Sequence, residues 1–255
     1  MQLLISQEWK DFRYCRVPLL IFWLLLVTEL LSGLSMNTGM LATFISAASV
    51  LLQQLLLLVL IPMLIQSDPP VGDTAFWLTR PITPCRLFAA KAAFLVIAVI
   101  LPQIATELLI LAANGIGVRY LLLAIPEILL DSGAFIVAVA TVAALTRNFA
   151  RYALAGVLVF IVMAVILPLF GCLIAPLLPT SCAARGMLSF EPVKLSLIAS
   201  KNILATILLI VGGIDIMQRQ YRTRQTKRSF RSALVLILLI FITKMLWPWD
   251  FMAGQ

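Results

Sequence analysis

The stretch MLATFISAASVLLQQLLLLVLIPMLI, residues 40–65, decides the fold because it contains no charged side chain. A helix of this length exceeds the roughly 30 Å of hydrocarbon in a bilayer, so it can cross with some tilt. Its apolar residues are continuous rather than alternating, which favours a helix over a barrel strand. We therefore predict a membrane-spanning helix, and we expect Gln53 and Gln54 within it to hydrogen-bond a neighbouring helix.

The rest of the chain has the same character. Of its 255 residues, 62% are hydrophobic and 12% are charged, whereas a soluble domain carries roughly 25% charged residues. Seven apolar runs predict an all-α integral membrane protein: Val17–Leu34, Met40–Ile65, Leu87–Ala113, Tyr120–Leu145, Tyr152–Leu178, Leu195–Met217 and Ala233–Leu246. Residues 1–16 place apolar and polar side chains on opposite faces, which predicts an interfacial helix in the membrane plane. The expected divisions are this helix, a six-span core (17–217), a basic cytoplasmic connector (218–232), a seventh apolar run (233–247) and a short tail (248–255).

The distribution of basic residues predicts the orientation. If the N-terminus is cytoplasmic, fourteen of the 19 Lys and Arg residues fall on the cytoplasmic side, as expected of topology signals. The remaining five are Arg119, Arg185, Lys194, Lys201 and Lys244. Because the basic residues lie between apolar runs, the net charge of +8 does not indicate nucleic-acid binding. The basic connector is a strong topology signal and could also bind anionic lipid. The C-terminus lies outside if the seventh run spans, and inside if that run lies flat or re-enters.

Five acidic residues fall inside the predicted spans: Glu29, Glu107, Glu127, Asp131 and Asp215. Ionisable groups in hydrocarbon are costly and often functional. Glu107, Glu127 and Asp131 are candidate polar residues of a translocation path, and the last two share one helical face because they are four residues apart. The alternative is that Glu107 and Glu127 lie near the outer surface with Arg119 and are hydrated. Asp215 is expected to pair with Arg219.

The longest polar segment between spans is QSDPPVGDTAFWLTRPITPCRLFAAK, residues 66–91. Its prolines and glycine interrupt a continuous helix, and Asp73 or Thr74 could cap a short helix containing Phe76 and Trp77. Two aromatic side chains beside Arg80 on a cytoplasmic loop indicate a docking surface. The alternative is that Phe76 and Trp77 lie against lipid headgroups.

Several motifs are absent from the sequence. There is no GxxxxGK[ST] loop, no GxSxG elbow and no histidine. ATP binding through a Walker site, histidine-dependent hydrolysis and HExxH-type proteolysis are therefore excluded, and we expect neither enzymatic activity nor a cofactor or metal in this chain. Among the four cysteines, Cys172 and Cys182 lie near the predicted outer side, where they either form a disulfide or remain unpaired.

The order of these features resembles the membrane subunit of a type-2 ABC transporter, a permease family of bacterial exporters. The resemblance covers about Met1–Met217 and rests on an N-terminal QEWKDFR helix, two spans, the DPPVGDTAFWLTRPI segment and a downstream Lys91.

The resemblance implies a function for the segment between the second and third spans. It implies that residues 66–91 hold a coupling helix that docks on a separate ABC ATPase through Asp73, Phe76, Trp77 and Arg80. It also implies a dimer with a second permease copy or homologue, location in the bacterial inner membrane, and ATP and Mg bound only by the partner ATPase.

The seventh apolar run departs from the six-span core of that family. Similar chains with this extension continue into a further soluble region, so a shortened chain is expected. Two other functions stay open: an ion-coupled secondary transporter using Glu107, Glu127 and Asp131, and an intramembrane enzyme using Asp131 with Asp215. Pro102 and Pro168 are candidate flex points for a transport movement. The sequence does not predict the cargo.

Overall fold

The computed structural model describes residues 2–34, 40–67, 83–146, 148–161, 192–223 and 225–245, and within these ranges the chain is helical apart from short turns. The elements are α1 (Gln2–Leu34), α2 (Met40–Gln66), α3 (Pro84–Leu95), the π-helical turn η2 (Val96–Ile100), α4 (Leu101–Ala113), α5 (Val118–Leu145), α6 (Phe149–Ile161), α9 (Pro192–Thr223) and α10 (Thr226–Met245). Five described segments are long and apolar enough to cross a membrane: Phe12–Leu34, Phe44–Gln66, Cys85–Ala113, Val118–Leu145 and Asn202–Thr223. The predicted all-α, multi-pass membrane architecture is confirmed.

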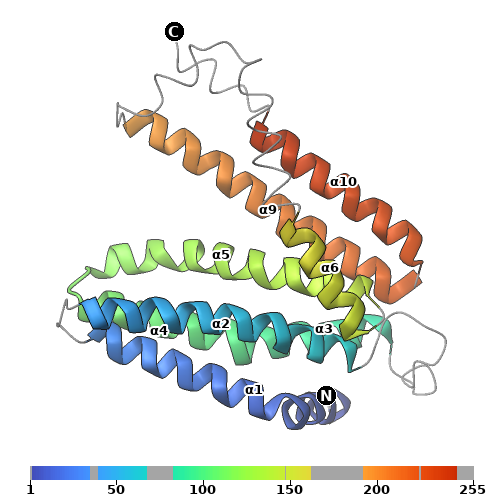
Figure 1. Ribbon diagram of the computed structural model, residues 1–255, viewed down its shortest axis with the longest axis horizontal. Coiled ribbons are helices and arrows are strands. Elements are labelled where there is room, and N and C mark those ends of the chain that lie inside the picture. The colour runs from blue at the N-terminus through green and yellow to red at the C-terminus, as the bar shows by residue number, and fades with distance from the viewer. Residues whose placement is uncertain are drawn as a thin grey trace.

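The helices form two groups. Helices α1, α2, α4 and α5 run side by side, and α9 and α10 form an antiparallel pair in which α9 packs against α5 (Figure 1). The core lies between α1, α2, η2 and α5, where Phe22, Leu60, Leu64, Val99 and Ala143 are buried. Many other large apolar side chains are exposed along the spans, as expected where lipid rather than water is the surrounding solvent.

The N-terminal helix differs from the prediction. No break separates an interfacial helix from the first span, because α1 is continuous from Gln2 to Leu34 with Pro18 inside it. Its first turns are seen nearly end-on in Figure 1 while the remainder runs across the view, so the helix bends rather than ends. Cys15, predicted to lie on the interfacial helix, is fully buried in the core.

The C-terminal helices also change the predicted boundaries. The predicted connector 218–232 is not a separate element, because α9 continues to Thr223 and α10 begins at Thr226. Arginine and lysine are good helix formers, so a basic stretch does not by itself end a helix. Helix α10 covers most of the seventh apolar run but is not one of the five described segments that meet the length and hydropathy criteria. Its crossing of the membrane stays a prediction.

Only the first part of the predicted fifth span is described, as α6; residues 162–191 lie outside the described ranges, together with Pro168, Cys172 and Cys182.

Two adjacent glycines in α9 allow close helix packing. A Cβ atom at Gly212 would lie 2.5 Å from Leu236 Cδ1 of α10. A Cβ atom at Gly213 would lie 2.9 Å from Thr141 Oγ1 of α5 and would also meet Val137. Small residues at membrane helix interfaces let the backbones approach closely, so this pair fixes α9 between α5 and α10.

Candidate functional site

Basic side chains gather at one end of the helical bundle, which we call the basic end. The start of α1, the end of α2, the start of α3 and the turn between α9 and α10 lie there (Figure 1). Its exposed basic residues are Arg13, Arg16, Arg86, Arg151, Arg219, Arg222, Lys227, Arg228 and Arg231. At the opposite end, Arg119 is the one basic residue whose side chain the structure describes. The residues of the basic end belong to the set predicted to face the cytoplasm, and the side of the membrane that the basic end faces stays a prediction.

Lys91 joins the ends of α2 and α3 at the basic end. Its side chain is 3% exposed, and its Nζ donates hydrogen bonds to the Leu64 carbonyl oxygen and, at 2.9 Å, to Ser67 Oγ. The Ser67 hydroxyl donates to the same Leu64 carbonyl at 2.8 Å. The last carbonyl groups of a helix lack intrahelical donors and carry a partial negative charge. The buried ammonium of Lys91 therefore gives a free carbonyl group at the C-terminus of α2 a hydrogen-bond donor and stabilises that helix end.

The bonds of Lys91 with Leu64 and Ser67 form what we call the Lys91 joint. Two further contacts link it to α5 and α9. Gln66 Nε2 at the end of α2 donates to Thr146 Oγ1 at the end of α5, at 3.2 Å. The rings of Phe88 in α3 and Tyr221 in α9 have centroids 5.7 Å apart, and Tyr221 is buried. The basic end of α3 is therefore fixed on one side to α2 and on the other to α9.

The predicted docking residues Asp73, Phe76, Trp77 and Arg80 lie outside the described ranges. Their flanks are described: Ser67 ends the α2 side, and α3 begins at Pro84 after an extended Thr83. Part of the predicted polar segment is therefore helical, since Arg86 and Lys91 both belong to α3. The intervening segment 68–82 connects two helices whose ends Lys91 holds together.

The third span contains a π-helical turn with a specific cause. Pro102 has no N–H to donate to the Ala98 carbonyl four residues earlier. The Leu101 N–H bonds to the Val96 carbonyl, five residues back rather than four, and the indole Nε1 of Trp23 in α1 donates to the Ala98 carbonyl at 2.9 Å. A side chain from a neighbouring helix thus satisfies the carbonyl that proline leaves free. Pro102 was a predicted flex point, and the helix is irregular immediately before it.

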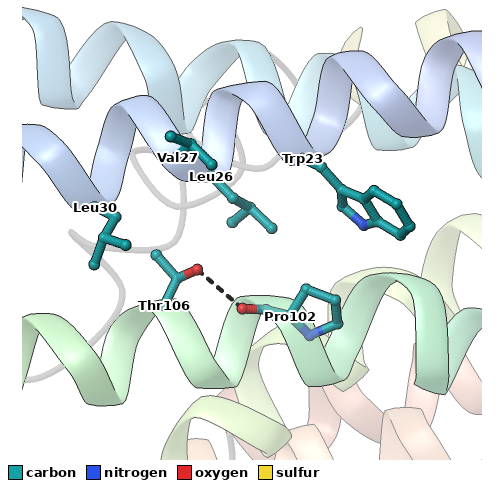
Figure 2. A pocket seen from close by; sticks show the side chains of 6 residues that line it. All are labelled: Trp23, Leu26, Val27, Leu30, Pro102 and Thr106. Atoms are coloured by element: carbon teal, nitrogen blue, oxygen red, sulfur yellow. Dashed lines mark hydrogen bonds between the residues drawn. The ribbon is translucent and has the colours of Figure 1, made fainter.

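Beside this turn, α1 and α4 enclose an open pocket of about 260 Å³ (Figure 2). Its lining is mostly apolar, and the residues are Trp23, Leu26, Val27, Leu30, Pro102 and Thr106. Thr106 Oγ1 donates to the Pro102 carbonyl oxygen at 3.0 Å, so the threonine hydroxyl is already engaged within α4. The pocket can hold an apolar group and offers little to a polar one.

Polar side chains from four helices approach one another between the spans, and we call Glu29, Gln53, Gln103, Glu107 and Asp131 the polar cluster. Gln53 Nε2 of α2 donates to Glu29 Oε2 of α1 at 2.7 Å, which confirms the predicted bond for Gln53. Within the described part of the chain, the buried Oε1 of Gln54 has no hydrogen-bond partner. In α4, Gln103 hydrogen-bonds Glu107, whose carboxylate also experiences the charges of Glu29 and Asp131. Among the described residues, no three acidic, cysteine or histidine side chains approach closely enough to hold a metal ion.

The other predicted acidic residues have different surroundings. Glu127 and Asp131 are both exposed on α5. Of these two carboxylates, Asp131 has a charge–charge interaction with Glu107. Asp215 forms the predicted pair with Arg219, with Nε–Oδ1 and Nη2–Oδ2 distances of 3.0 and 2.8 Å. It therefore belongs to the basic end and not to the polar cluster.

Sequence reasoning did not predict the partners of Glu29, Lys91 and Trp23. Glu29 was recognised as an acidic residue within a span, but nothing in the sequence places it opposite Gln53. Lys91 was counted as a topology signal and as part of the family resemblance, but neither use predicted its bonds to the end of α2. The presence of Pro102 could have indicated a free carbonyl at Ala98, but the donor comes from a helix 75 residues away.

Comparisons with protein-family models, with curated proteins and with solved structures found no match to this chain. Helix length and hydropathy establish a multi-pass helical membrane protein.

Proposed function

We propose that this chain is the membrane-spanning permease subunit of an ATP-binding-cassette transporter. In this proposal it is an exporter subunit of the bacterial inner membrane that pairs with a second permease copy or a homologue. A separate cytoplasmic ATPase, which binds ATP and Mg, docks on the segment 68–82 through Asp73, Phe76, Trp77 and Arg80. The observation that carries the proposal is the buried Lys91 joint, which links the two helices on either side of that segment.

The joint gives a physical route for force. A push on the segment 68–82 would act on α2 and α3 together, because Lys91 of α3 is bonded to Leu64 and Ser67 at the end of α2. The Phe88–Tyr221 contact would pass the displacement to α9. Transport requires two arrangements of the helices that the ATPase stabilises differently, and the π-helical turn before Pro102 offers a place for the third span to change its bend.

The test is association with a separate cytoplasmic ABC ATPase, which is sought first in the neighbouring reading frames. We expect Phe76→Ala with Trp77→Ala to abolish co-purification of that ATPase and ATP-driven transport. Phe149→Ala is the matched control, because it removes an exposed aromatic ring from the same end of the bundle but outside the segment. If the double variant binds the ATPase and transports as well as wild type, the docking assignment is wrong.

The polar cluster favours a second candidate function, an ion-coupled secondary transporter. Glu29, Glu107 and Asp131 come from three helices and interact electrostatically, and carboxylates in this setting are typical of proton and cation pathways. Under this alternative, purified chain in vesicles would transport when driven by a proton gradient and without any ATPase, and Glu107→Gln would abolish the transport. Under the ABC proposal, a proton gradient alone drives no transport.

A further inference from the structure

The turn between α9 and α10 forms a rigid basic surface, which we call the basic hairpin (residues 219–231). Its inner side is fixed by packing: Gln220, Tyr221 and Ser229 are buried, and Gln220 Nε2 donates to Thr226 Oγ1 across the turn at 3.2 Å. The two helix ends are therefore held in register.

The outer side of the basic hairpin carries an excess of positive charge. The described basic side chains Arg219, Arg222, Lys227, Arg228 and Arg231 are all exposed, and the sequence from 219 to 231 contains no acidic residue. Asp215 neutralises Arg219. Within the part of the chain that the structure describes, Lys227, Arg228 and Arg231 have no acidic partner.

The flanking helices set the depth of this surface in the membrane. Helix α9 reaches the hairpin as the span Asn202–Thr223, and α10 leaves it with Leu234, Val235 and Leu238 exposed. Apolar helix surfaces on both sides place the turn at the boundary between hydrocarbon and water. Phe230, 56% exposed among the basic residues, presents an apolar ring that the hydrocarbon edge of that boundary would cover.

We infer that the basic hairpin is a binding site for the phosphate headgroups of anionic phospholipids in the leaflet at the basic end. Arginine forks suit bidentate phosphate contacts, and the headgroups already lie at the depth of Lys227, Arg228 and Arg231. An acidic protein partner would have to displace those headgroups first. This inference requires only that the chain spans the membrane and does not depend on the transporter proposal.

The test compares lipids retained by the purified chain in nanodiscs that contain phosphatidylcholine and phosphatidylglycerol. The readout is the ratio of the two lipids that remain bound, measured by native mass spectrometry. We expect wild type to enrich phosphatidylglycerol and the triple variant K227Q/R228Q/R231Q to lose that enrichment, since each basic residue near an anionic surface contributes about fivefold to the affinity. The control Arg119→Gln removes a basic residue at the opposite end and should leave the ratio unchanged.

Two further measurements keep the inference falsifiable if the triple variant does not fold. The charge-retaining variant R228K/R231K should keep the enrichment, and wild type should lose most of it when salt rises from about 0.1 to about 1 M, where the Debye length falls to about 3 Å. The inference is overturned if wild type shows no enrichment, if the triple variant retains it, or if Arg119→Gln removes it equally. A hairpin that binds only the ATPase and no anionic lipid would also overturn it.

Discussion

Replacement of Lys91 by methionine tests whether the joint between α2 and α3 is structurally important. Methionine keeps an unbranched apolar stem of similar length in the buried site and removes the ammonium group. The hydrogen bonds from Nζ to the Leu64 carbonyl and to Ser67 Oγ are then lost. We expect the variant to insert and fold, with the end of α2 held less firmly against α3.

The expected loss in the free energy of unfolding depends on which hydrogen bonds remain in the variant. A hydrogen bond involving a charged group contributes about 1.5–3 kcal/mol. The Leu64 carbonyl keeps the bond from the Ser67 hydroxyl, and removal of the ammonium also removes the cost of burying it. We therefore expect a net loss equal to one such bond, about 2–3 kcal/mol in the free energy of unfolding. For a chain of this size the apparent Tm should fall by about 4–12 °C.

The assay is thermal unfolding of the purified chain in detergent, with Arg86→Met as the control. Arg86 is an exposed basic residue on the same helix, five positions earlier, so its replacement removes the same charge without breaking the joint. If the two variants unfold within about 1 °C of each other, Lys91 does not stabilise the end of α2. The proposed route for force from the segment 68–82 then loses its support.

Three other substitutions test the packing of the spans, each by the change in apparent Tm. Gly213→Val should destabilise the fold by about 1–3 kcal/mol because the added side chain would clash with α5. The control Gly156→Val, where an added Cβ has no atom within 4 Å, should have little effect. Equal effects of the two variants would contradict the close packing of α9. Trp23→Phe should cost about 1–3 kcal/mol by leaving the carbonyl of the π-helical turn without its donor, and no change would show that this bond is dispensable. Glu29→Ala should cost about 1–3 kcal/mol because Gln53 loses its partner, and adding Gln53→Leu should recover part of the loss; a further loss would refute the pairing.

The sequence was sufficient to predict the class of fold. Long uncharged runs such as residues 40–65 permit only helices in a bilayer, because backbone polar groups must be satisfied within the segment. The bias in Arg and Lys also predicted which ends of the helices lie together. Both signals depend on local composition, which does not require knowledge of tertiary contacts.

Contacts between distant helices could not be predicted in the same way. The Trp23–Ala98 bond and the Glu29–Gln53 bond depend on helix rotation and register, which composition does not set. One continuous helix runs through the boundary predicted between residues 16 and 17, and Cys15 on its N-terminal side is already buried in the core. The predicted docking residues depend on a resemblance to a family, and hydropathy carries no information about a partner.

The proposed function depends most directly on what contacts the segment 68–82. A photocrosslinking residue at position 77 should join this chain to an ABC ATPase in intact cells. The same residue at position 116, exposed in the turn between α4 and α5 at the opposite end, should not. Crosslinking to the ATPase from position 77 alone is the predicted result; no product from position 77, or an ATPase product from position 116, would contradict the proposal.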